Sequence, residues 1–453
     1  MNYRTTLIMA LVFCVGLAAV LLIKNQDTKK TEEKESAGKL LDIDKAAVTE
    51  LILEPAALHF IRDGENWNIV NPVETDGDKA TVDAILNMFD WAKIDRTIAT
   101  DSVEYGDYGL APEAGKMIVV HDGKADTLFV GENTPTGSFV FARKNGSPEV
   151  FLTTTSLQTN IQKTLFEVRN KKVLRFDVNN IKELVLTNRR GKIELLKAGA
   201  EWMLKGKNNV SGDISEINQL TNRLNSETAK EFVDENPADL QKYGLTNPVL
   251  KVDLLLGEEK SQATLLVGKA LNDKYYAKDD SRQPVFLVDS AFVNLFDVSV
   301  TDLRNKNIVN FNQSDVDKIE LAFTGQTIVC EKDTAGNWLV VAPESGLAKS
   351  YQITLLLSNL SSLKAEEFVD DNPASLDMYG LSKPQVTCKV YQNGLLLKET
   401  LLGKEKSGKV YAKTADNKSV YLVSKDNAEK IKPKLEDILD VEKDEKTLES
   451  ENM

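Results

Sequence analysis

One repeated spacing limits what this chain can fold into. Three tryptophans lie 135 and 136 residues apart, and three Tyr-Gly-Leu tripeptides show the same two intervals; these anchors are Trp67, Trp202, Trp338, Tyr108, Tyr243 and Tyr379. A period of this length is too long for a solenoid unit and suits a whole domain. The sequence therefore predicts three tandem copies of one domain.

The ends of the copies are marked by a short motif. It reads RNKKVLRF at 169–176 and RNKNIVNF at 304–311, with no Gly-, Pro- or Ser-rich spacer, and the third copy lacks it. We interpret the motif as a junction, which favours stacked over freely jointed domains. The predicted repeat domains are 41–175, 176–310 and 311–441, followed by a disordered tail at 442–453.

Each copy follows the same order of local patterns. Short alternating apolar runs come first, then the tryptophan strand, then a helix whose apolar residues recur at helical spacing: Val82, Ile85, Leu86 and Phe89 in the first copy, and Ile353, Leu356, Leu357 and Leu360 in the third. Later strands turn at Asp122-Gly123 or Asn393-Gly394, which favour tight hairpins. A closing helix is predicted at 156–168. The predicted class is α+β: three tandem, mostly antiparallel sheet domains with packed helices, preceded by one N-terminal transmembrane helix.

The Tyr-Gly-Leu tripeptide is interpreted as a helix stop. Asn236 is suited to the N-cap, Pro237 to the first helical position and Gly244 to the left-handed residue that ends a helix. In the first copy, Asp101 and Glu104 are predicted to cap the equivalent helix.

The N-terminus predicts a membrane anchor. Residues 7–23 are uncharged and apolar, follow Arg4, and nearly suffice to cross the hydrocarbon layer as a helix. The apolar run continues past its small residues, which favours an uncleaved anchor (1–23) over a signal peptide. Residues 24–40 form a charged tether. Because short tails before a single span usually stay inside, we expect a single-pass inner (cytoplasmic) membrane protein with extracytoplasmic repeats, which contacts lipid through residues 7–23.

Net charge argues against a nucleic-acid partner. The chain has 56 basic and 69 acidic residues, for a formal charge of −13, whereas phosphate binding relies on clustered Lys and Arg.

The cysteines allow at most one disulfide outside the anchor. Cys14 lies in the apolar run, which leaves Cys330 and Cys388. These two either form a bridge or are small buried side chains in strands.

Catalytic signals are weak. His59 and His121 occur only in the first copy, and CxxC, HExxH and GxSxG motifs are absent from the sequence. Residues 403–409 have the Gly and Lys spacing of a phosphate-binding loop, but Val410 replaces the Mg²⁺-binding Ser or Thr and a strand follows, so we predict a hairpin.

The acidic segments and the tryptophans are the remaining candidates for ligand binding. The segments 233–240 and 369–376 carry Asp and Asn residues that could bind Ca²⁺, but Ser375 replaces Asp239 in the third copy. The three repeated tryptophans are predicted to fill cores, and Trp91, present in one copy only, is predicted to lie at the surface. No catalytic, cofactor-binding or metal-binding residue is therefore predicted, and no cofactor.

These motifs together resemble a bacterial family catalogued as domain of unknown function 4340. The resemblance spans residues 41 to about 441 and rests on the tryptophan strand, the Tyr-Gly-Leu with a nearby Pro (YGLAP, YGLTNP, YGLSKP), a Val-Gly or Leu-Gly turn, and paired strands such as VYAK and VYLV. It implies a membrane segment, an extracytoplasmic body, and genes that neighbour gliding-motility-type ABC transporter subunits. The resemblance assigns no catalytic residues to this chain.

Three functions follow as hypotheses. The first is a non-enzymatic, membrane-anchored extracytoplasmic accessory protein associated with an ABC-type transporter complex of the cell envelope. The second is a module that binds a sugar, lipid or peptide near the Tyr-Gly-Leu turn, which predicts exposed aromatics shared by all copies. The third is an envelope hydrolase, which predicts a polar cleft with two close carboxylates in one domain.

Overall fold

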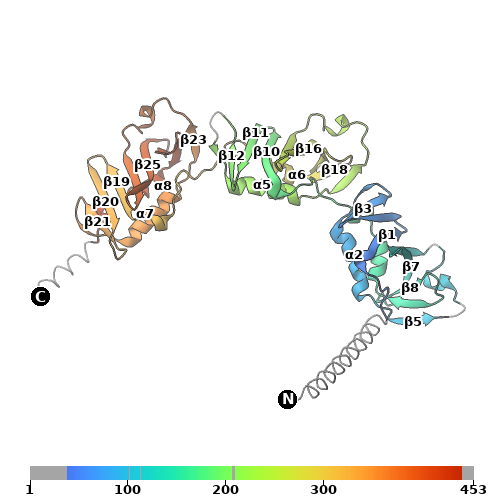
Figure 1. Cartoon of the computed structure of the whole chain (residues 1–453). Coiled ribbons are helices and arrows are strands. Elements are labelled where there is room, and N and C mark those ends of the chain that lie inside the picture. The colour runs from blue at the N-terminus through green and yellow to red at the C-terminus, as the bar shows by residue number, and fades with distance from the viewer. Residues whose placement is uncertain (1–37, 101–102, 113, 207–209, 441–453) are drawn as a thin grey trace, which may run out of the picture. The chain divides into compact units, whose positions relative to one another are not determined.

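The computed structural model describes residues 38–100, 103–112, 114–206 and 210–440. The predicted anchor, the tether before Gly38 and the tail at 442–453 lie outside these residues. Within the described part, none of the helices combines the length and the apolar character needed to cross a membrane. Three nine-stranded sheets occur in succession, one in each repeat, and every described strand pair is antiparallel (Figure 1).

In its described residues, repeat 1 has nine strands, three α-helices and two short 3₁₀ turns. Its elements are η1 (Lys45–Ala47), β1 (Val48–Glu54), β2 (Leu58–Asp63), β3 (Asn66–Asn71), β4 (Thr75–Asp76), α2 (Lys79–Trp91), β5 (Arg96–Ala99), η2 (Tyr105–Tyr108), β6 (Gly115–His121), β7 (Lys124–Asn133), β8 (Val140–Lys144), β9 (Val150–Thr153), α3 (Ser156–Ile161) and α4 (Leu165–Val168).

Repeat 2 follows the same order. Its elements are η3 (Val178–Asn180), β10 (Ile181–Asn188), β11 (Gly191–Ala198), β12 (Glu201–Leu204), β13 (Val210–Ser211), α5 (Ile214–Ser226), β14 (Glu231–Asp234), η4 (Gln241–Tyr243), β15 (Leu250–Leu256), β16 (Ser261–Leu271), β17 (Lys274–Asp279), β18 (Val285–Asp289) and α6 (Ser290–Leu295).

Repeat 3 completes the series. Its elements are η5 (Gln313–Asp315), β19 (Lys318–Phe323), β20 (Gln326–Lys332), β21 (Trp338–Ala342), β22 (Gly346–Leu347), α7 (Ser350–Ser361), β23 (Glu367–Asp370), η6 (Asp377–Tyr379), β24 (Val386–Gln392), β25 (Leu395–Lys406), β26 (Lys409–Thr414), β27 (Val420–Ser424), α8 (Lys425–Glu429) and α9 (Leu435–Ile438).

All three sheets have the same strand order. In repeat 1 it is β4-β3-β2-β1-β6-β7-β8-β9-β5, so two meanders join at β1 and β6, and β5 crosses to the far edge beside β9. Asp122 and Gly123, with φ of 48° and 70°, form the tight turn between β6 and β7, and Asn393 and Gly394 form its counterpart in repeat 3. The predicted hairpins are therefore confirmed.

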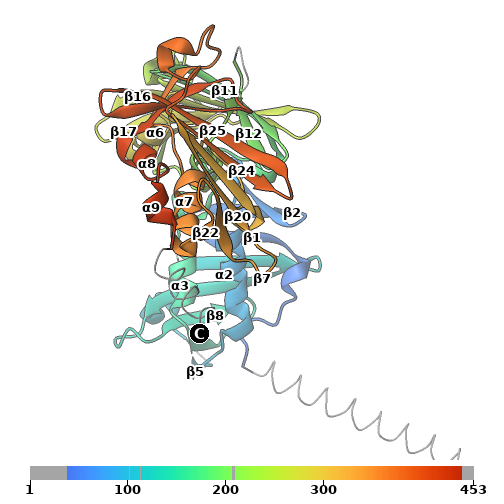
Figure 2. The ribbon, with the colours of Figure 1, turned by 90° about the vertical axis from the view of Figure 1, so that its left-hand side faces the viewer.

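Helices cover one face of each sheet, as α7, α8 and α9 do in repeat 3 (Figure 2). Helix α2 begins where Asp78 accepts a hydrogen bond from Thr81 N, and Asp213 caps α5 in the same way. The repeated tryptophans Trp67, Trp202 and Trp338 are 1%, 1% and 5% exposed, which confirms them as core residues.

The closing helix predicted at 156–168 is interrupted. Residues 162–164 separate α3 from α4, and the side chains of Thr164 and Glu167 form a capping box that starts a new helix. The local capping signal therefore overrides the continuous apolar pattern.

The Tyr-Gly-Leu segments cover the opposite face of the C-terminal half of each sheet. Tyr379 and Leu381 pack with Tyr411, Val420 and Leu422 in a small second core. The preceding helix is a single 3₁₀ turn in each repeat, so the helix predicted from Asn236 is wrong: Asp234 and Asp239 instead accept hydrogen bonds from nearby backbone N–H groups. Glu104 makes no side-chain cap, and Asp101, the other residue of the predicted cap, lies outside the described residues.

The predicted left-handed stop is confirmed, with φ of 72° at Gly244 and 71° at Gly380. A second glycine explains the Val-Gly and Leu-Gly pairs, which lie inside a strand and not in a turn. A Cβ at Gly268 would lie 2.1 Å from the Tyr243 carbonyl oxygen, so only glycine permits this approach.

Candidate functional site

At each junction, residues only three positions apart pair with two successive sheets, one in each repeat. At the first junction (169–172), Arg169 bridges to Gly77 of repeat 1 and Lys172 bridges to Thr228 of repeat 2. At the second junction (304–307), Arg304 bridges to Gly212 and Asn307 to Lys364. The motif interpreted as a junction therefore lies between sheets, and its backbone pairs with both.

An ion pair with a buried arginine lies at the first junction. The Arg169 side chain is 2% exposed; its Nη1 and Nη2 donate to the two carboxylate oxygens of Glu235 at 2.5 and 3.0 Å. Its guanidinium also lies 3.5 Å from the centroid of the Phe232 ring. Because Glu235 follows β14, the pair links the end of repeat 1 to the edge of the second sheet, and residues 228–238 belong to the same compact unit as repeat 1.

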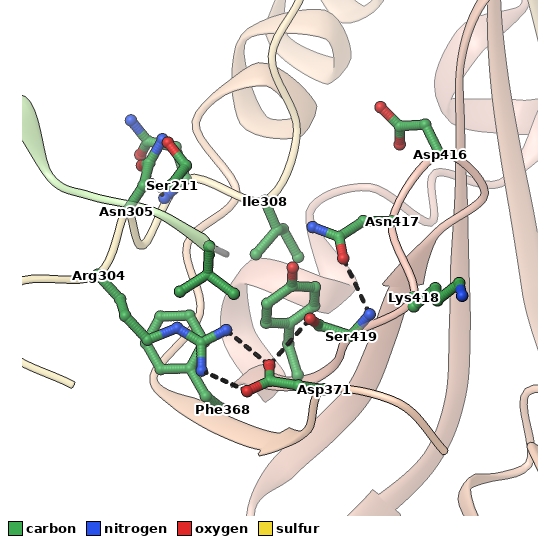
Figure 3. Close-up of a pocket in the computed structure, with 13 residues that line it drawn as sticks. Ser211, Arg304, Asn305, Ile308, Phe368, Asp371, Asp416, Asn417, Lys418 and Ser419 are labelled. Atoms are coloured by element: carbon green, nitrogen blue, oxygen red, sulfur yellow. Dashed lines mark hydrogen bonds and ion pairs between the residues drawn. The ribbon is translucent and has the colours of Figure 1, made fainter. Parts of the chain in front are cut away.

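The second junction repeats this arrangement with different residues (Figure 3). Arg304 donates from Nη1 and Nη2 to the carboxylate of Asp371 at 3.0 and 2.7 Å and lies 3.8 Å from the Phe368 ring centroid. Ser419 Oγ donates to Asp371 Oδ1 at 2.9 Å. Bidentate geometry of this kind is stronger and more directional than a single charged hydrogen bond. We call these two sets of contacts the arginine clamps.

Clamp residues are missing at the N-terminal side of repeat 1 and at the C-terminal side of repeat 3. In repeat 1, Thr97 and Thr100 stand where repeat 2 has Phe232 and Glu235. In repeat 3, Leu439 stands at the arginine position and forms the matching bridge to Ala348. Arginines thus occur only where a following repeat supplies the acid, and acids only where a preceding repeat supplies the arginine.

A polar pocket of about 430 Å³ adjoins the second clamp. It lies among β13, the second junction, β23 and the loop before β27, and its lining includes Asn305, Asp371, Asp416 and Asn417 (Figure 3). Asn417 Oδ1 accepts a hydrogen bond from Ser419 N at 2.9 Å, which fixes the loop.

The pKa values of the two carboxylates in this pocket are both lowered. The hydrogen bonds from Arg304 hold the pKa of Asp371 below its ordinary value. Burial opposes ionisation of Asp416, yet the hydrogen bond from Lys398 leaves its pKa lowered as well. A pair of carboxyl groups that works as general acid and general base needs one member that keeps its proton near neutral pH, whereas both of these have a lowered pKa.

Both histidines lie in repeat 1 and pair with carboxylates. His59 Nε2 lies 2.8 Å from Glu50 Oε2, and His121 Nε2 lies 2.8 Å from Asp126 Oδ2. The hydrogen bond to Asp126, with a weaker one to Asp122, raises the pKa of His121 despite its burial. Each histidine therefore has a structural partner on its own sheet.

The phosphate-loop-like segment and the acidic segment of repeat 3 form turns and hydrogen bonds within the fold. Residues 403–409 comprise the end of β25, a turn at Ser407 and Gly408, which have positive φ, and the first residue of β26, so they form a hairpin as predicted. Asp370 accepts hydrogen bonds from Asn372 N and the Tyr379 hydroxyl. Among the described residues, no group of three His, Cys, Asp or Glu is placed to hold a metal ion.

Cys330 and Cys388 are free and buried. They lie on β20 and β24, which flank β19 on opposite sides, opposite Ile319 and Leu321 respectively. A full strand separates them, so the disulfide alternative is wrong. Burial raises the pKa of both thiols to about 12.

Sequence reasoning identified the junction motif but missed its acidic partners. Glu235 and Asp371 were considered only as parts of acidic segments. A comparison of the three repeats could have found them. An arginine at the end of one repeat always occurs with an acid at the matched position of the next repeat, as in Arg169 with Glu235 and Arg304 with Asp371. Where one of the two is missing, so is the other: Leu439 replaces the arginine and Thr100 replaces the acid.

Comparisons with known proteins place these features in a family. A search of curated proteins finds no match. Two solved structures from Pseudomonas aeruginosa, a DNA polymerase sliding clamp with ligand and the DNA polymerase III subunit beta, are each 10% identical, cover 86% and 84% of this chain and 94% and 92% of their own, and have a TM-score of 0.15, too low to bear on fold or function.

The family described as Domain of unknown function (DUF4340) matches three times, at residues 67–209, 202–350 and 338–452. Each match begins at a repeated tryptophan and the first two continue past a junction into the next sheet. With most of the chain covered by these three matches, the protein belongs to the Domain of unknown function (DUF4340) family.

Proposed function

We propose that this protein is a non-enzymatic, membrane-anchored accessory protein of the cell envelope, associated with an ABC-type transporter complex on the extracytoplasmic side. The observation that carries the proposal is the pair of arginine clamps. Arg169 and its counterpart Arg304 are both buried and both bind carboxylates of the next repeat. Charged residues are thus used to join domains, which is the requirement of a scaffold.

The pocket chemistry supports a role other than catalysis. Asp371 and Asp416 are both held ionised by basic neighbours, so the pair lacks a general acid. The repeated tryptophans are buried, which removes the exposed aromatic platform expected of a sugar, lipid or peptide module. The membrane anchor rests on residues 7–23, and the transporter partner rests on the family resemblance.

The partner is tested by crosslinking in native membranes. We expect crosslinked complexes of the full chain to contain ABC permease subunits, identified by mass spectrometry. The control is a chain in which residues 1–23 are replaced by a cleavable secretion signal, which should lose the permease through loss of membrane residence. Recovery of no transporter subunit with the anchored chain would overturn the partner.

The side of the membrane is tested by thiol labelling of intact cells. Cys330 and Cys388 are buried, so they give a low background. A cysteine at exposed Asn417 should react with a membrane-impermeant maleimide before lysis. Reaction only after lysis would place the repeats in the cytoplasm.

A further inference from the structure

Each repeat has a segment whose backbone forms a hydrogen bond with the stretch of chain that leads into that repeat, which we call the arriving chain. We call these the receiving segments: 93–100, 228–235 and 364–371. In each, a backbone N–H donates at 2.7 Å to a carbonyl of the arriving chain: Ile94 to Gly38, Ala229 to Lys171 and Ala365 to Lys306. The backbone contact is therefore the same in all three repeats, and their side chains can be compared position by position.

The charge of the receiving segment changes sign in repeat 1. Segment 93–100 has Lys93, Arg96 and one acid, Asp95, for a net charge of +1, whereas 228–235 has one Lys and three acids (−2) and 364–371 has one Lys and four acids (−3). Arg96 occupies the position of Glu231 and Glu367. The receiving segments of repeats 2 and 3 bind arginine, and the cationic one of repeat 1 suits an anionic partner.

Trp91 adds an exposed aromatic beside this cationic segment. It is the last residue of α2 and is 54% exposed, whereas the matched residues in the other repeats are Ser226 and Ser362. Its neighbour Ala92 accepts a hydrogen bond from Leu40 N at 2.8 Å, so Trp91 lies next to the arriving chain. Ile98 on the edge strand β5 is also exposed.

The arriving chain of repeat 1 comes from the predicted anchor. Residues 24–37 separate the end of the apolar run from Gly38. A segment of this length spans at most about 50 Å. The bilayer surface is therefore within reach of the receiving segment of repeat 1, where a preceding repeat would lie for the other two.

We propose that the receiving segment of repeat 1 binds the anionic headgroup surface of the bilayer, with Trp91 in the interfacial layer and Lys93 and Arg96 paired with lipid phosphates. Tryptophan favours this layer because it has an apolar ring and a polar N–H. Basic residues near the surface are attracted to anionic lipids. This inference rests on the proposed membrane anchor.

Tryptophan fluorescence tests the contact in the full chain. Trp91 is the exposed one of four tryptophans, and the other three are buried in cores. The protein is reconstituted in vesicles of phosphatidylcholine with phosphatidylglycerol whose acyl chains are brominated near the headgroup. We expect quenching and a blue shift of the Trp91 emission, both lost in Trp91→Ser, which restores the residue of repeats 2 and 3.

Charge is tested separately with Lys93→Thr and Arg96→Glu, the residues of repeat 2. We expect reduced quenching in these variants, in vesicles of phosphatidylcholine alone, and at high salt, because screening shortens the reach of surface charges. Equal quenching in the neutral vesicles would overturn the role of anionic lipid.

Failure of the anchor and failure of the contact give different results. If alkaline washing removes the chain from the vesicles, the proposed anchor is wrong. If the chain stays and Trp91 emission is unchanged by brominated lipid, the anchor stands and the lipid contact is wrong. A photoreactive residue at position 91 that crosslinks to protein and not to lipid in native membranes would also overturn the lipid contact.

Discussion

The two arginine clamps occupy matched positions but differ in depth. The Arg169 side chain is 2% exposed and that of Arg304 is 10% exposed; their acids, Glu235 and Asp371, are 33% and 41% exposed. At the first junction, Phe166 packs edge-on against Phe232. The residue of repeat 2 matched to Phe166 is the exposed Thr301, so the second clamp lacks this cover and instead adjoins the polar pocket.

This difference indicates that the two junctions, although built from one motif, lose different amounts of unfolding free energy when the acid is removed. A buried guanidinium without a partner costs free energy because it loses water without gaining a charged acceptor. At the second junction, water in the pocket can hydrate Arg304 if the acid is removed. The predictions below test whether burial decides the strength of each clamp.

Removing Glu235 should have the largest effect. Glu235→Ala leaves Arg169 buried without its carboxylate, and we expect a loss of about 3 kcal/mol of unfolding free energy. Urea unfolding of the full chain in detergent measures it. Glu258→Ala is the control, since Glu258 forms an exposed pair with Lys182 and should leave the midpoint unchanged. A change no larger than the control's would show that the first clamp does not stabilise the junction.

Removing Asp371 should cost less. Asp371→Ala is expected to lower the unfolding free energy by about 2 kcal/mol, because the pocket admits water to Arg304. The same urea titration applies, with exposed Lys418→Ala as the control. A loss greater than that of Glu235→Ala would contradict burial as the deciding factor.

Shortening the buried clamp separates geometry from charge. Glu235→Asp keeps the carboxylate but removes one methylene, so the bidentate contact with Arg169 should lengthen at a cost of about 1 kcal/mol. The measurement is the unfolding midpoint alongside Glu235→Ala. Equal losses for the two variants would mean that geometry, and not charge, carries the first clamp.

Acid should weaken the second clamp. Arg304 lowers the pKa of Asp371 below 3.8, the ordinary value, so ionised Asp371 favours the folded state above that pH, and this contribution falls as pH drops through the folded-state pKa. Unfolding free energy measured from neutral pH to below 3.8 should fall less steeply in Asp371→Asn than in the native chain. Parallel curves would show that Asp371 has no part in the acid response.

The smallest effect is expected where the aromatic residues of the two clamps differ. Phe368 packs edge-on against Tyr421, as Phe232 does against Phe286. Tyr421→Phe makes the second clamp resemble the first and should change the unfolding free energy by less than about 0.5 kcal/mol. A larger loss in urea unfolding would assign the Tyr421 hydroxyl a structural role.

Much of the fold could be predicted because its signals are local. The spacing of Trp67, Trp202 and Trp338 gave three copies, and the apolar positions of the helix at 79–91 gave its buried face. The helix predicted from Asn236 failed because Asp234 and Asp239 form their own backbone hydrogen bonds, which compete with a helical start.

The clamps could not be derived from local pattern. Arg169 and Glu235 are 66 residues apart, and nothing in either segment indicates that they meet. Residue type alone gave two acidic segments of similar appearance, 233–240 and 369–376, and it could not distinguish an acid that binds arginine from one that turns the backbone.

The sequence by itself determined the number of repeats, the helix at 79–91, the hairpin positions and the left-handed Gly244, because periodicity, turn chemistry and backbone sterics act over a few residues. Only the tertiary structure decided that β5, β14 and β23 lie at the sheet edge that meets the arriving chain, and that Arg169 and Arg304 bind the acids beside those edges. The physical reason is that ion pairing and burial depend on which distant segments the sheet brings together, and strand order is a property of the whole repeat.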